Sequence, residues 1–502
     1  MKYAECYKRK NMLESKQNKK SGVLMPIFSL PSNYGIGTLG EEAYRFIDVL
    51  VKSRQNFWQV LPLNPTSYGD SPYQSPSAFA GNPYFIDLDF LCKDGLLTEK
   101  ECRAERTRGQ YIDYARLYRR RIPVLRKAYG RFKKSKAFDA FLQTNSDWLC
   151  GYSKFMALKE QNDQKVWNEW TQTAEPEPAE QEFWQFIQFI FFRQWNALKA
   201  YANEHGIQMI GDMPIYVAYD SADVWQNRLN FNLDDKGNPS EVAGVPPDAF
   251  SETGQLWGNP IYNWAYMKQN GYEWWHRRMK HALNMFDWVR IDHFIGFIRY
   301  YCIPADETDA RVGEWRKGPG VDLFKGFEKE NIIAEDLGLL TDEVREAISL
   351  TGYPGMKILQ HAFGGDTDCE HKPSNFSPNN VVYTGTHDNE TLYQRISATK
   401  RKNRKTLIED LKRECGLVGI RPRYFTSKQI CKSILSLLFR SNARIVVVPV
   451  SDLLLIGNKG RINAPSTLGN NWRWRCRPRY RLFQKRLLSL TKLRETTQIK
   501  TD

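Results

Sequence analysis

The segment Phe286-Asp287-Trp288-Val289-Arg290-Ile291-Asp292-His293 is a short apolar run that ends in an acid and a histidine. The same order recurs at Ile332–Leu337 and at Val381–Thr384, where acids or a histidine again stand at or just beyond the end of the run. A short apolar run bounded by polar residues is typical of a buried strand in a parallel sheet. These segments therefore predict strands whose ends carry ionisable side chains.

Five further runs of this kind lie along the chain, and helical patterns separate several of them. Glu41–Lys52 places its apolar residues on one helical face, and Phe183–His205 forms a second helical pattern that Gly206 ends. Strands that alternate with helices predict an α/β fold with a parallel sheet covered by helices. The other runs are Val23–Leu30, Trp58–Leu63, Met209–Val217, Met356–Leu359 and Ile445–Val450.

Eight runs predict a (β/α)8 TIM barrel with large insertions and no separate C-terminal β-sandwich, and the count of eight rests in part on the resemblance given below. The interval between the second and third runs is far longer than one crossover helix needs. We therefore expect residues 21–75 and 183–480 to form the barrel, with an inserted subdomain at 76–182. A second insertion at 220–284 is rich in aromatic residues and is expected to carry a lid loop, and residues 481–502 are expected to form a basic tail.

The net charge of +15 is concentrated in the last fifth of the chain. Residues 401–502 hold 24 Lys and Arg against 6 Asp and Glu, whereas the rest of the chain holds 48 against 51. The alternating arginines between Arg473 and Arg481 could present a phosphate-binding stripe. Because no nucleic-acid-binding motif accompanies them, we favour a solvated basic surface and expect no nucleic-acid partner.

The cysteines and the hydropathy indicate a cytoplasmic protein. Nine cysteines are scattered without a Cys-x-x-Cys pair, which is typical of reduced thiols rather than of a disulfide framework. Mean hydropathy is −0.58, and no apolar stretch approaches the ~20 residues that a membrane span needs. No apolar signal core precedes Val23. We therefore expect a soluble, cytoplasmic protein without a membrane partner.

The acids at three strand ends indicate chemistry on a glycosidic bond. In a (β/α)8 barrel the C-terminal ends of the strands meet at the active site. One carboxylate there can attack the anomeric carbon while a carboxylic acid protonates the leaving oxygen, and a third negative group can stabilise the oxocarbenium-like charge. A single strand-end acid is more often a helix cap or a surface residue, but three in the same context favour a catalytic site.

Motifs between these runs follow one another through most of the chain. The motifs are Ser29-Leu30-Pro31, Tyr34-Gly35-Ile36-Gly37, Trp58-Gln59-Val60-Leu61-Pro62-Leu63, Tyr68-Gly69-Asp70-Ser71-Pro72-Tyr73, Ala80-Gly81-Asn82-Pro83, Gly211-Asp212-Met213-Pro214, Pro246-Pro247-Asp248-Ala249-Phe250-Ser251 and Gly254-Gln255-Leu256-Trp257-Gly258-Asn259-Pro260. Together they resemble the 4-α-glucanotransferases, the amylomaltase or disproportionating-enzyme family of the α-amylase superfamily. The resemblance is dense from about residue 21 to 394 and resumes at Val448–Arg475.

The resemblance implies a role for each strand-end acid. Asp292 would be the nucleophile, Glu335 the general acid/base and Asp388 the transition-state stabiliser. Arg290 would hold Asp292 ionised, because a nearby cation favours the charged form of a carboxylate. Since the family retains anomeric configuration, we expect the carboxyl groups of Asp292 and Glu335 to lie about 5–5.5 Å apart.

Other residues at the same mouth are expected to bind glucan. His293 and His387 would line the reacting subsite, and the loop Pro246–Pro260 could cover the acceptor side and keep water away from the intermediate. The expected substrate-binding residues are Tyr68, Tyr73, Asp212, Asp248, Phe250, Gln255, Trp257, Arg290, His293, His387, Arg461 and Asn463.

The resemblance implies a 4-α-glucanotransferase that moves α-1,4-glucan segments between maltooligosaccharides by a retaining double displacement, with no metal and no organic cofactor. Asp212-Met213-Pro214 stands where hydrolytic α-amylases carry an Asn-His pair, which favours transfer. Two alternatives remain: an α-glucan hydrolase on the same barrel, and a non-catalytic basic protein that binds nucleic acid. Residues 395–445 depart from the family pattern, and the Gly-Trp pair expected soon after Asn389 is absent.

Overall fold

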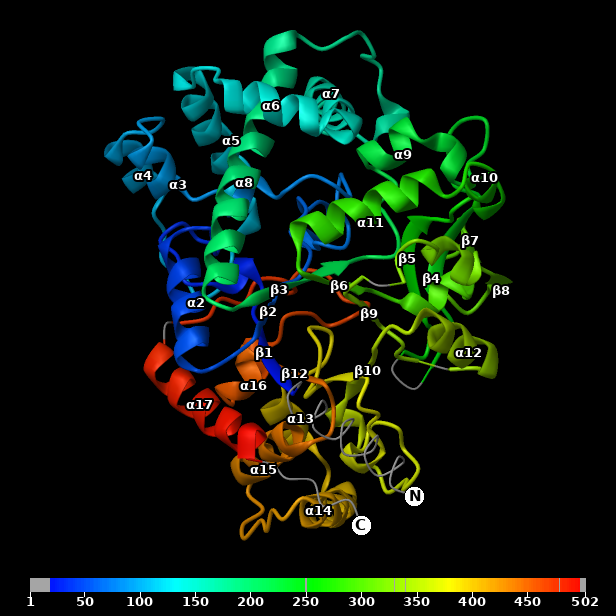
Figure 1. Ribbon diagram of the computed structural model, residues 1–502. Coiled ribbons are helices and arrows are strands. Elements are labelled where there is room, and N and C mark those ends of the chain that lie inside the picture. Colours follow the sequence, from blue (N-terminus) through cyan, green and yellow to red (C-terminus); the bar gives the residue numbers. More distant parts are fainter. Residues whose placement is uncertain (1–18, 249–250, 329, 339, 478, 497–502) are drawn as a thin grey trace, which may run out of the picture.

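The computed structural model describes residues 19–248, 251–328, 330–338, 340–477 and 479–496. At its centre, eight parallel strands close into a barrel in the order β1-β12-β11-β10-β9-β6-β3-β2 (Figure 1). Each strand overlaps one of the eight apolar runs, so the predicted (β/α)8 barrel is confirmed. The strands are β1 (Lys20–Leu24), β2 (Phe57–Gln59), β3 (Gln208–Met213), β6 (Trp288–Ile291), β9 (Ile332–Ala334), β10 (Gly355–Ile358), β11 (Asn380–Tyr383) and β12 (Ile445–Pro449).

The first strand, β1, covers only the start of the run that predicted it. Residues Ile27–Ser29 form a buried 3-10 turn instead, and Pro26 stands just before that turn. Proline has no N–H to donate, so it cannot continue a strand ladder. The second half of this apolar run is therefore buried in a turn beside the barrel rather than in the sheet.

Alternate residues of each strand fill the barrel interior. On β12, Ile445 and Val447 belong to the interior cluster, whereas Val446 and Val448 belong to the larger core that the helices share. Side chains at positions i and i+2 of a strand point to the same face, so a residue two places beyond an interior one also points inward. The interior cluster is formed by Leu24, Phe57, Ile210, Trp288, Ile333, Met356, Ile358, Val381, Tyr383, Ile445 and Val447.

Helices follow most of the strands. α2 spans Glu41–Lys52, as its apolar periodicity predicts, and α8 spans Pro178–Glu204, beginning five residues earlier than predicted. Pro178 occupies the first turn of α8, where a helix tolerates proline. The helix α11 (Glu273–Met285) stands at the end of the 220–284 segment, just before β6. The other helices outside the insertions are α12 (Asp342–Thr351), α13 (Leu392–Ala398), α14 (Arg401–Leu417), α15 (Ser427–Arg440), α16 (Val450–Leu453) and α17 (Tyr480–Thr496).

The segment expected to be a basic tail forms α17 over most of its described length. Phe483 and Leu487 are buried, and α17 packs against α2 and α15 (Figure 1). The guanidinium of Arg494 is also buried and donates to the carbonyls of Phe439 and Ala443. The Arg494 side chain therefore holds α17 against the chain around Phe439 and Ala443.

Two of the arginines that alternate before α17 bind backbone carbonyls in other parts of the chain. The buried Arg475 side chain donates to the carbonyls of Gly109 and Ser32, and Arg473 donates to the carbonyl of Ile112. These two guanidinium groups tie the C-terminal segment to the chain between β2 and β3. They are engaged with backbone carbonyls rather than arranged as a free phosphate-binding stripe.

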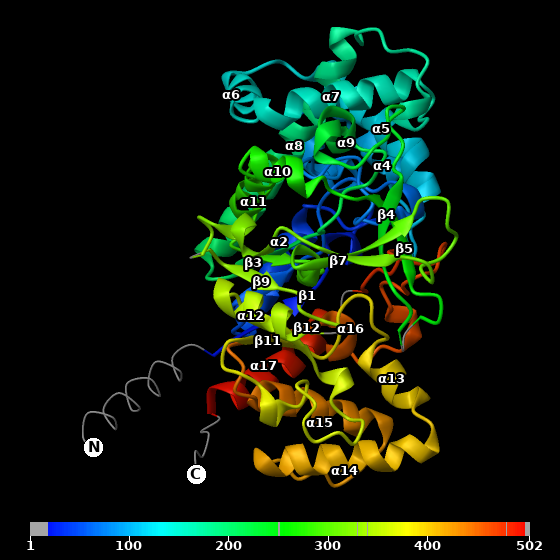
Figure 2. The ribbon, with the colours of Figure 1, turned by 90° about the vertical axis from the view of Figure 1, so that its right-hand side faces the viewer.

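The long interval between β2 and β3 contains five α-helices before α8. Figure 2 shows α5, α6 and α7 together at one end of the molecule, opposite the end that holds α14 and α15. The five helices are α3 (Leu88–Lys93), α4 (Glu99–Glu105), α5 (Tyr114–Arg131), α6 (Lys136–Thr144) and α7 (Ser146–Gln161).

A second sheet, which the sequence analysis did not predict, stands beside the barrel. It is antiparallel, in the order β5-β4-β7-β8, and combines β4 (Glu241–Val245) and β5 (Gln255–Pro260) with β7 (Arg299–Pro304) and β8 (Glu314–Lys317). The interval 220–284 thus shares a sheet with the chain that follows β6. The short helices α9 (Ala222–Gln226) and α10 (Trp264–Gln269) complete this region.

Within the described ranges, no helix is both long enough and apolar enough to cross a membrane. The eight cysteines in those ranges are all free thiols.

Candidate active site at the barrel mouth

Strand periodicity brings an arginine and three acids to neighbouring positions inside the barrel mouth. Asp212 lies two residues beyond the interior Ile210 on β3, and Arg290 lies two residues beyond Trp288 on β6. The parallel register pairs Asp212 directly with Arg290. Asp292 lies just after β6, and Glu335 lies just after β9. Each lies two residues beyond a strand residue that points into the barrel or pairs with the neighbouring strand.

Arg290 is the centre of this cluster. Its side chain is only 4% exposed; one Nη lies 2.6 Å from Asp212, and the other lies 2.9 Å from Asp292 and 3.9 Å from Glu335. The Tyr73 hydroxyl donates to the other oxygen of Asp212 at 2.7 Å. A buried guanidinium shared by carboxylates stabilises their charged forms and fixes their directions. Arg290 therefore orients the acids of β3, β6 and β9 toward one space.

Glu335 has the properties of a general acid. Burial, and next the negative charge of Asp292, raise its pKa to about 8, although Arg290 and two backbone N–H groups oppose the shift. Those N–H groups belong to His293 and Leu337, and each donates to a different carboxylate oxygen at 2.8 Å. Burial thus favours the protonated form of Glu335, while Asp292 is paired with the guanidinium of Arg290.

His293 links the acids to the second sheet. Its backbone is in the left-handed region, with φ of 46°, which is uncommon for a residue other than glycine and directs its N–H at Glu335. Burial lowers the pKa of the His293 imidazole, so the ring is neutral. The indole of Trp257 on β5 meets this ring edge to face at 5.0 Å between centroids.

Asp388 enters the mouth from the loop after β11. The Asn463 side-chain amide donates to one oxygen of its carboxylate at 2.6 Å, and Arg461 donates to its backbone carbonyl at 3.2 Å. Nε2 of His387 lies 3.3 Å from the other carboxylate oxygen, and the His387 ring stacks on Tyr73 at 5.1 Å. Asp388 thus has hydrogen-bond partners of its own. Its side chain is more exposed than those of Asp292 and Glu335.

The residues predicted from sequence divide into three groups. The first group lies together at the mouth: Tyr73, Asp212, Trp257 and the residues that follow β6, β9 and β11 or belong to the 461–463 segment. Asp248 instead lies in an exposed turn, where its carboxylate accepts from the N–H of Ser251, and Gln255 reaches the site only by accepting from the Trp257 indole. Phe250 and the side chain of Tyr68 lie outside the described residues, and the predicted separation of the Asp292 and Glu335 carboxyl groups stays a prediction.

Trp472 is a member of the site that the sequence analysis did not select. Its buried indole lies 5.6 Å from the Tyr73 ring and 5.7 Å from the His387 ring, so the three rings form one cluster. The available signal was its place in the 448–475 stretch, where the family resemblance resumes. Asp336, by contrast, stands next to Glu335 in sequence but turns away from the mouth and binds Lys357 and the N–H of Met356.

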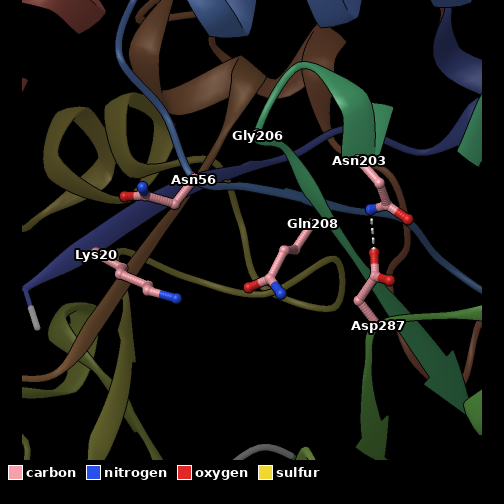
Figure 3. A pocket seen from close by; sticks show the side chains of 6 residues that line it. All are labelled: Lys20, Asn56, Asn203, Gly206, Gln208 and Asp287. Atoms are coloured by element: carbon pink, nitrogen blue, oxygen red, sulfur yellow. Dashed lines mark hydrogen bonds between the residues drawn. The ribbon is translucent and has the colours of Figure 1, made fainter. Parts of the chain in front are cut away.

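The described residues contain no group of three or more His, Cys, Asp or Glu side chains that could hold a metal ion. A cavity of about 330 Å³ lies at the opposite end of the barrel, at the starts of β1, β2 and β3 (Figure 3). Its Asp287 already accepts from Asn203 and from the N–H of Met209. Since active sites of this fold lie at the C-terminal strand ends, this cavity is separate from the site.

Known proteins resemble the chain over nearly its whole length. A family model described as 4-alpha-glucanotransferase matches residues 25–481. The 4-alpha-glucanotransferases of Streptococcus pneumoniae and Clostridium butyricum are each 44% identical to it, covering 91% and 90% of this chain and 93% and 95% of their own. The solved amylomaltase from Streptococcus agalactiae in complex with acarbose superposes with a TM-score of 0.88 at 37% identity, covering 96% of this chain and 100% of its own.

Proposed function

This chain belongs to the 4-α-glucanotransferase family and is an enzyme of that activity, and we propose that it moves α-1,4-glucan segments between maltooligosaccharides by a retaining double displacement. The observation that carries this mechanism is the arrangement around Arg290. One carboxyl group, Asp292, is ion-paired and partly exposed, and the other, Glu335, is buried and protonated. Retaining glycosidic chemistry needs two carboxyl groups in these opposite states.

In the first half-reaction, Asp292 attacks the anomeric carbon of the donor glucan. The bond from that carbon to the glycosidic oxygen breaks, and Glu335 gives its proton to the leaving oxygen. The non-reducing part of the donor becomes an ester of Asp292, and the reducing part leaves with a new hydroxyl group. Glu335 is left as a carboxylate, stabilised by the N–H groups of His293 and Leu337.

In the second half-reaction, the 4-hydroxyl group of an acceptor glucan replaces the leaving chain. Glu335 takes the hydroxyl proton, the oxygen attacks the anomeric carbon, and Asp292 departs as a carboxylate. Each step inverts the anomeric centre, so the product retains the α configuration. The two half-reactions leave both carboxyl groups in their starting states.

Two further acids, Asp388 and Asp212, have separate roles in this proposal. The sugar ring gains positive charge in each transition state, and a fixed carboxylate such as Asp388 lowers the energy of that charge. Asp212 is buried and bound to both Arg290 and Tyr73, so it positions these two residues. The Tyr73, His387 and Trp472 rings would offer apolar surface to the sugar bound there.

Transfer requires that an acceptor sugar reach the ester before water does. Trp257 stands against His293, and the Gln74 side chain donates to the Trp257 carbonyl, so β5 is tied to the mouth. We propose that the loop between β4 and β5, with Trp257, covers the acceptor side and excludes water. The Streptococcus agalactiae amylomaltase was solved with acarbose, and we propose that α-glucans bind the same mouth in this chain.

Incubation with maltotriose alone tests the activity directly. We expect glucose and a ladder of longer maltooligosaccharides, with almost no rise in total reducing ends, because each transfer preserves the number of glycosidic bonds. Chromatography of the products and a reducing-end assay measure the two quantities. Glucose and maltose with steadily rising reducing ends would instead mean hydrolysis, the alternative on the same barrel.

The pH dependence tests the role of Glu335. The first step needs the protonated form, and a pKa raised to about 8 keeps that form present through neutral pH. We therefore expect kcat/KM on maltotriose to fall as the pH rises through about 8, approaching tenfold per pH unit. A maltosyl fluoride donor is the control, because fluoride leaves without a proton and its glycosylation step should not show this loss. An undiminished rate on maltotriose at pH 9.5 would contradict the assignment.

Two further predictions remain proposals. The first is the division of the chain into a barrel, an inserted subdomain at 76–182 and the 220–284 insertion. The second is a cytoplasmic location. The eight free thiols among the described residues support the second.

A further inference from the structure

The loop that carries Asp388 is bound at both ends by one buried carboxylate. This loop runs from Thr384, at the end of β11, to Leu392, the first residue of α13. Asp452 lies in α16, directly after β12, and one of its oxygens accepts the Thr384 hydroxyl at 2.6 Å. The other oxygen accepts the N–H of Leu392 at 2.7 Å. A single side chain from the neighbouring strand end thus closes the loop at its base.

Asp452 pays a desolvation cost for this position. Asp452 is 1% exposed, and among the described residues no ion pair joins its carboxylate to a Lys, Arg or His side chain. Burial raises its pKa to about 6, against the effect of the Thr384 and Leu392 hydrogen bonds. A buried acid without a cation destabilises a fold unless its hydrogen bonds compensate. Such a group at a barrel mouth indicates a role beyond packing.

Asp452 and His387 also line one small cavity. This cavity of about 20 Å³, enough for a single water molecule, is lined by Glu390 and Arg461 as well, together with neighbouring residues of the loop and of β12. Burial, and next the charge of Asp452, raise the pKa of the Cys431 thiol on α15. On the mouth side, Asn463 and Arg461 hold Asp388 itself. The loop is therefore held at its middle from the mouth and at its two ends by Asp452.

We propose that Asp452 is a positioning residue for the transfer reaction, which sets the place of Asp388 by holding Thr384 and Leu392 together. The proposal rests on the role of Asp388 given above. The contacts at Asn463 and Arg461 fix the tip of the loop relative to the 461–463 segment, and the stacking of His387 on Tyr73 ties its middle to the mouth. Asp452 adds the contact that joins the two ends of the loop at its base. A shift of about 1 Å in a catalytic group is enough to cost roughly a hundredfold in rate.

The chain offers a matched control for the test. Asp87 is also buried, and it accepts the Thr38 hydroxyl at 2.6 Å and the N–H of Phe90 at 3.2 Å, but it lies at the start of α3, outside the site. Asp452→Ala and Asp87→Ala thus each delete a threonine bond and a backbone bond of the same kind. Thr384→Val and Thr38→Val delete only the hydroxyl groups.

We expect Asp452→Ala to lower kcat on maltotriose about tenfold to a hundredfold with KM changed less than threefold, and Thr384→Val to give a smaller loss in the same direction. Asp87→Ala and Thr38→Val should keep kcat within twofold once activity is corrected for the folded fraction. Asp452→Asn should recover most of the rate, because its amide can keep both bonds if the Thr384 hydroxyl reverses and accepts. Thermal unfolding and circular dichroism report the folded fraction of each variant.

A double-mutant cycle with Asp388→Asn separates positioning from general structural damage. On an activated maltosyl fluoride donor, Asp452→Ala should cost little further activity in the Asp388→Asn background, because the group that it positions is already absent. Equal losses in both backgrounds, or a folded Asp452→Ala enzyme with kcat within twofold of the parent, would overturn the proposal. If Asp388→Asn itself keeps the parent rate, the role of Asp388 fails instead, which is a distinguishable result.

Discussion

Replacement of Asp292 by asparagine is expected to lower turnover on maltotriose by roughly 10⁴-fold or more, the scale typical of removing a covalent nucleophile. The amide has nearly the shape of the carboxylate but cannot form the glycosyl ester, and it places no negative charge beside the anomeric carbon. Arg290 keeps its bond to Asp212 at 2.6 Å, so the rest of the cluster retains its centre. The loss should therefore appear in kcat rather than in folding.

Release of glucose from maltotriose, followed under saturating conditions, measures this effect. The matched control is Asp48→Asn on the outer helix α2, which removes a carboxylate that accepts one hydrogen bond from Tyr201 of α8. That variant should retain the parent rate. An Asp292→Asn enzyme that is folded and retains more than about a tenth of the parent kcat would remove Asp292 from the role of nucleophile.

Replacement of Glu335 by glutamine is expected to lower turnover on maltotriose by about 10²–10⁴-fold, the usual contribution of a general acid. Glutamine cannot protonate the leaving oxygen, and it cannot accept the proton of an incoming hydroxyl group. It can still accept one of the two N–H bonds that now hold the carboxyl group. With a maltosyl fluoride donor the first half-reaction needs no acid, whereas the second still needs the base.

A covalent maltosyl adduct should therefore accumulate on the Glu335→Gln enzyme when this fluoride is added. Mass spectrometry of the intact protein, and then of the peptide that contains Asp292, measures it. The double variant with Asp292→Asn is the control and should form no adduct. A fluoride donor that reacts no faster than maltotriose in the single variant, or an adduct on another residue, would contradict the assignment of Glu335.

Local patterns predicted the strands of the barrel and the acids at their ends, and the family resemblance helped to complete the count of eight. Buried parallel strands are short and apolar, so each one is visible as a run such as Ile445–Val450, and α2 follows from its 3.6-residue periodicity. Acids that end such runs must meet at one end of a barrel, whatever the exact register. Asp292, Glu335 and Asp388 could therefore be selected without any distances.

The second sheet and α17 show where local patterns stop being sufficient. β4 pairs with β7, a strand that follows β6, so this partner lies far from β4 in sequence. The arginines of the last hundred residues looked like a basic tail because charge is visible in sequence and burial is not. Arg494 and Arg475 are buried because backbone carbonyls from distant segments surround them.

The sequence by itself determined the eight strands, the acids at their ends and the family to which the chain is similar, because these depend on residue type and short-range spacing. Only the tertiary structure decided that Arg290 is shared by Asp212, Asp292 and Glu335, that Glu335 is protonated, and that Asp452 closes the loop of Asp388. The physical reason is the same in each case. Protonation and hydrogen bonding depend on burial and on contacts between residues that are distant in sequence, and those exist only once the barrel has closed.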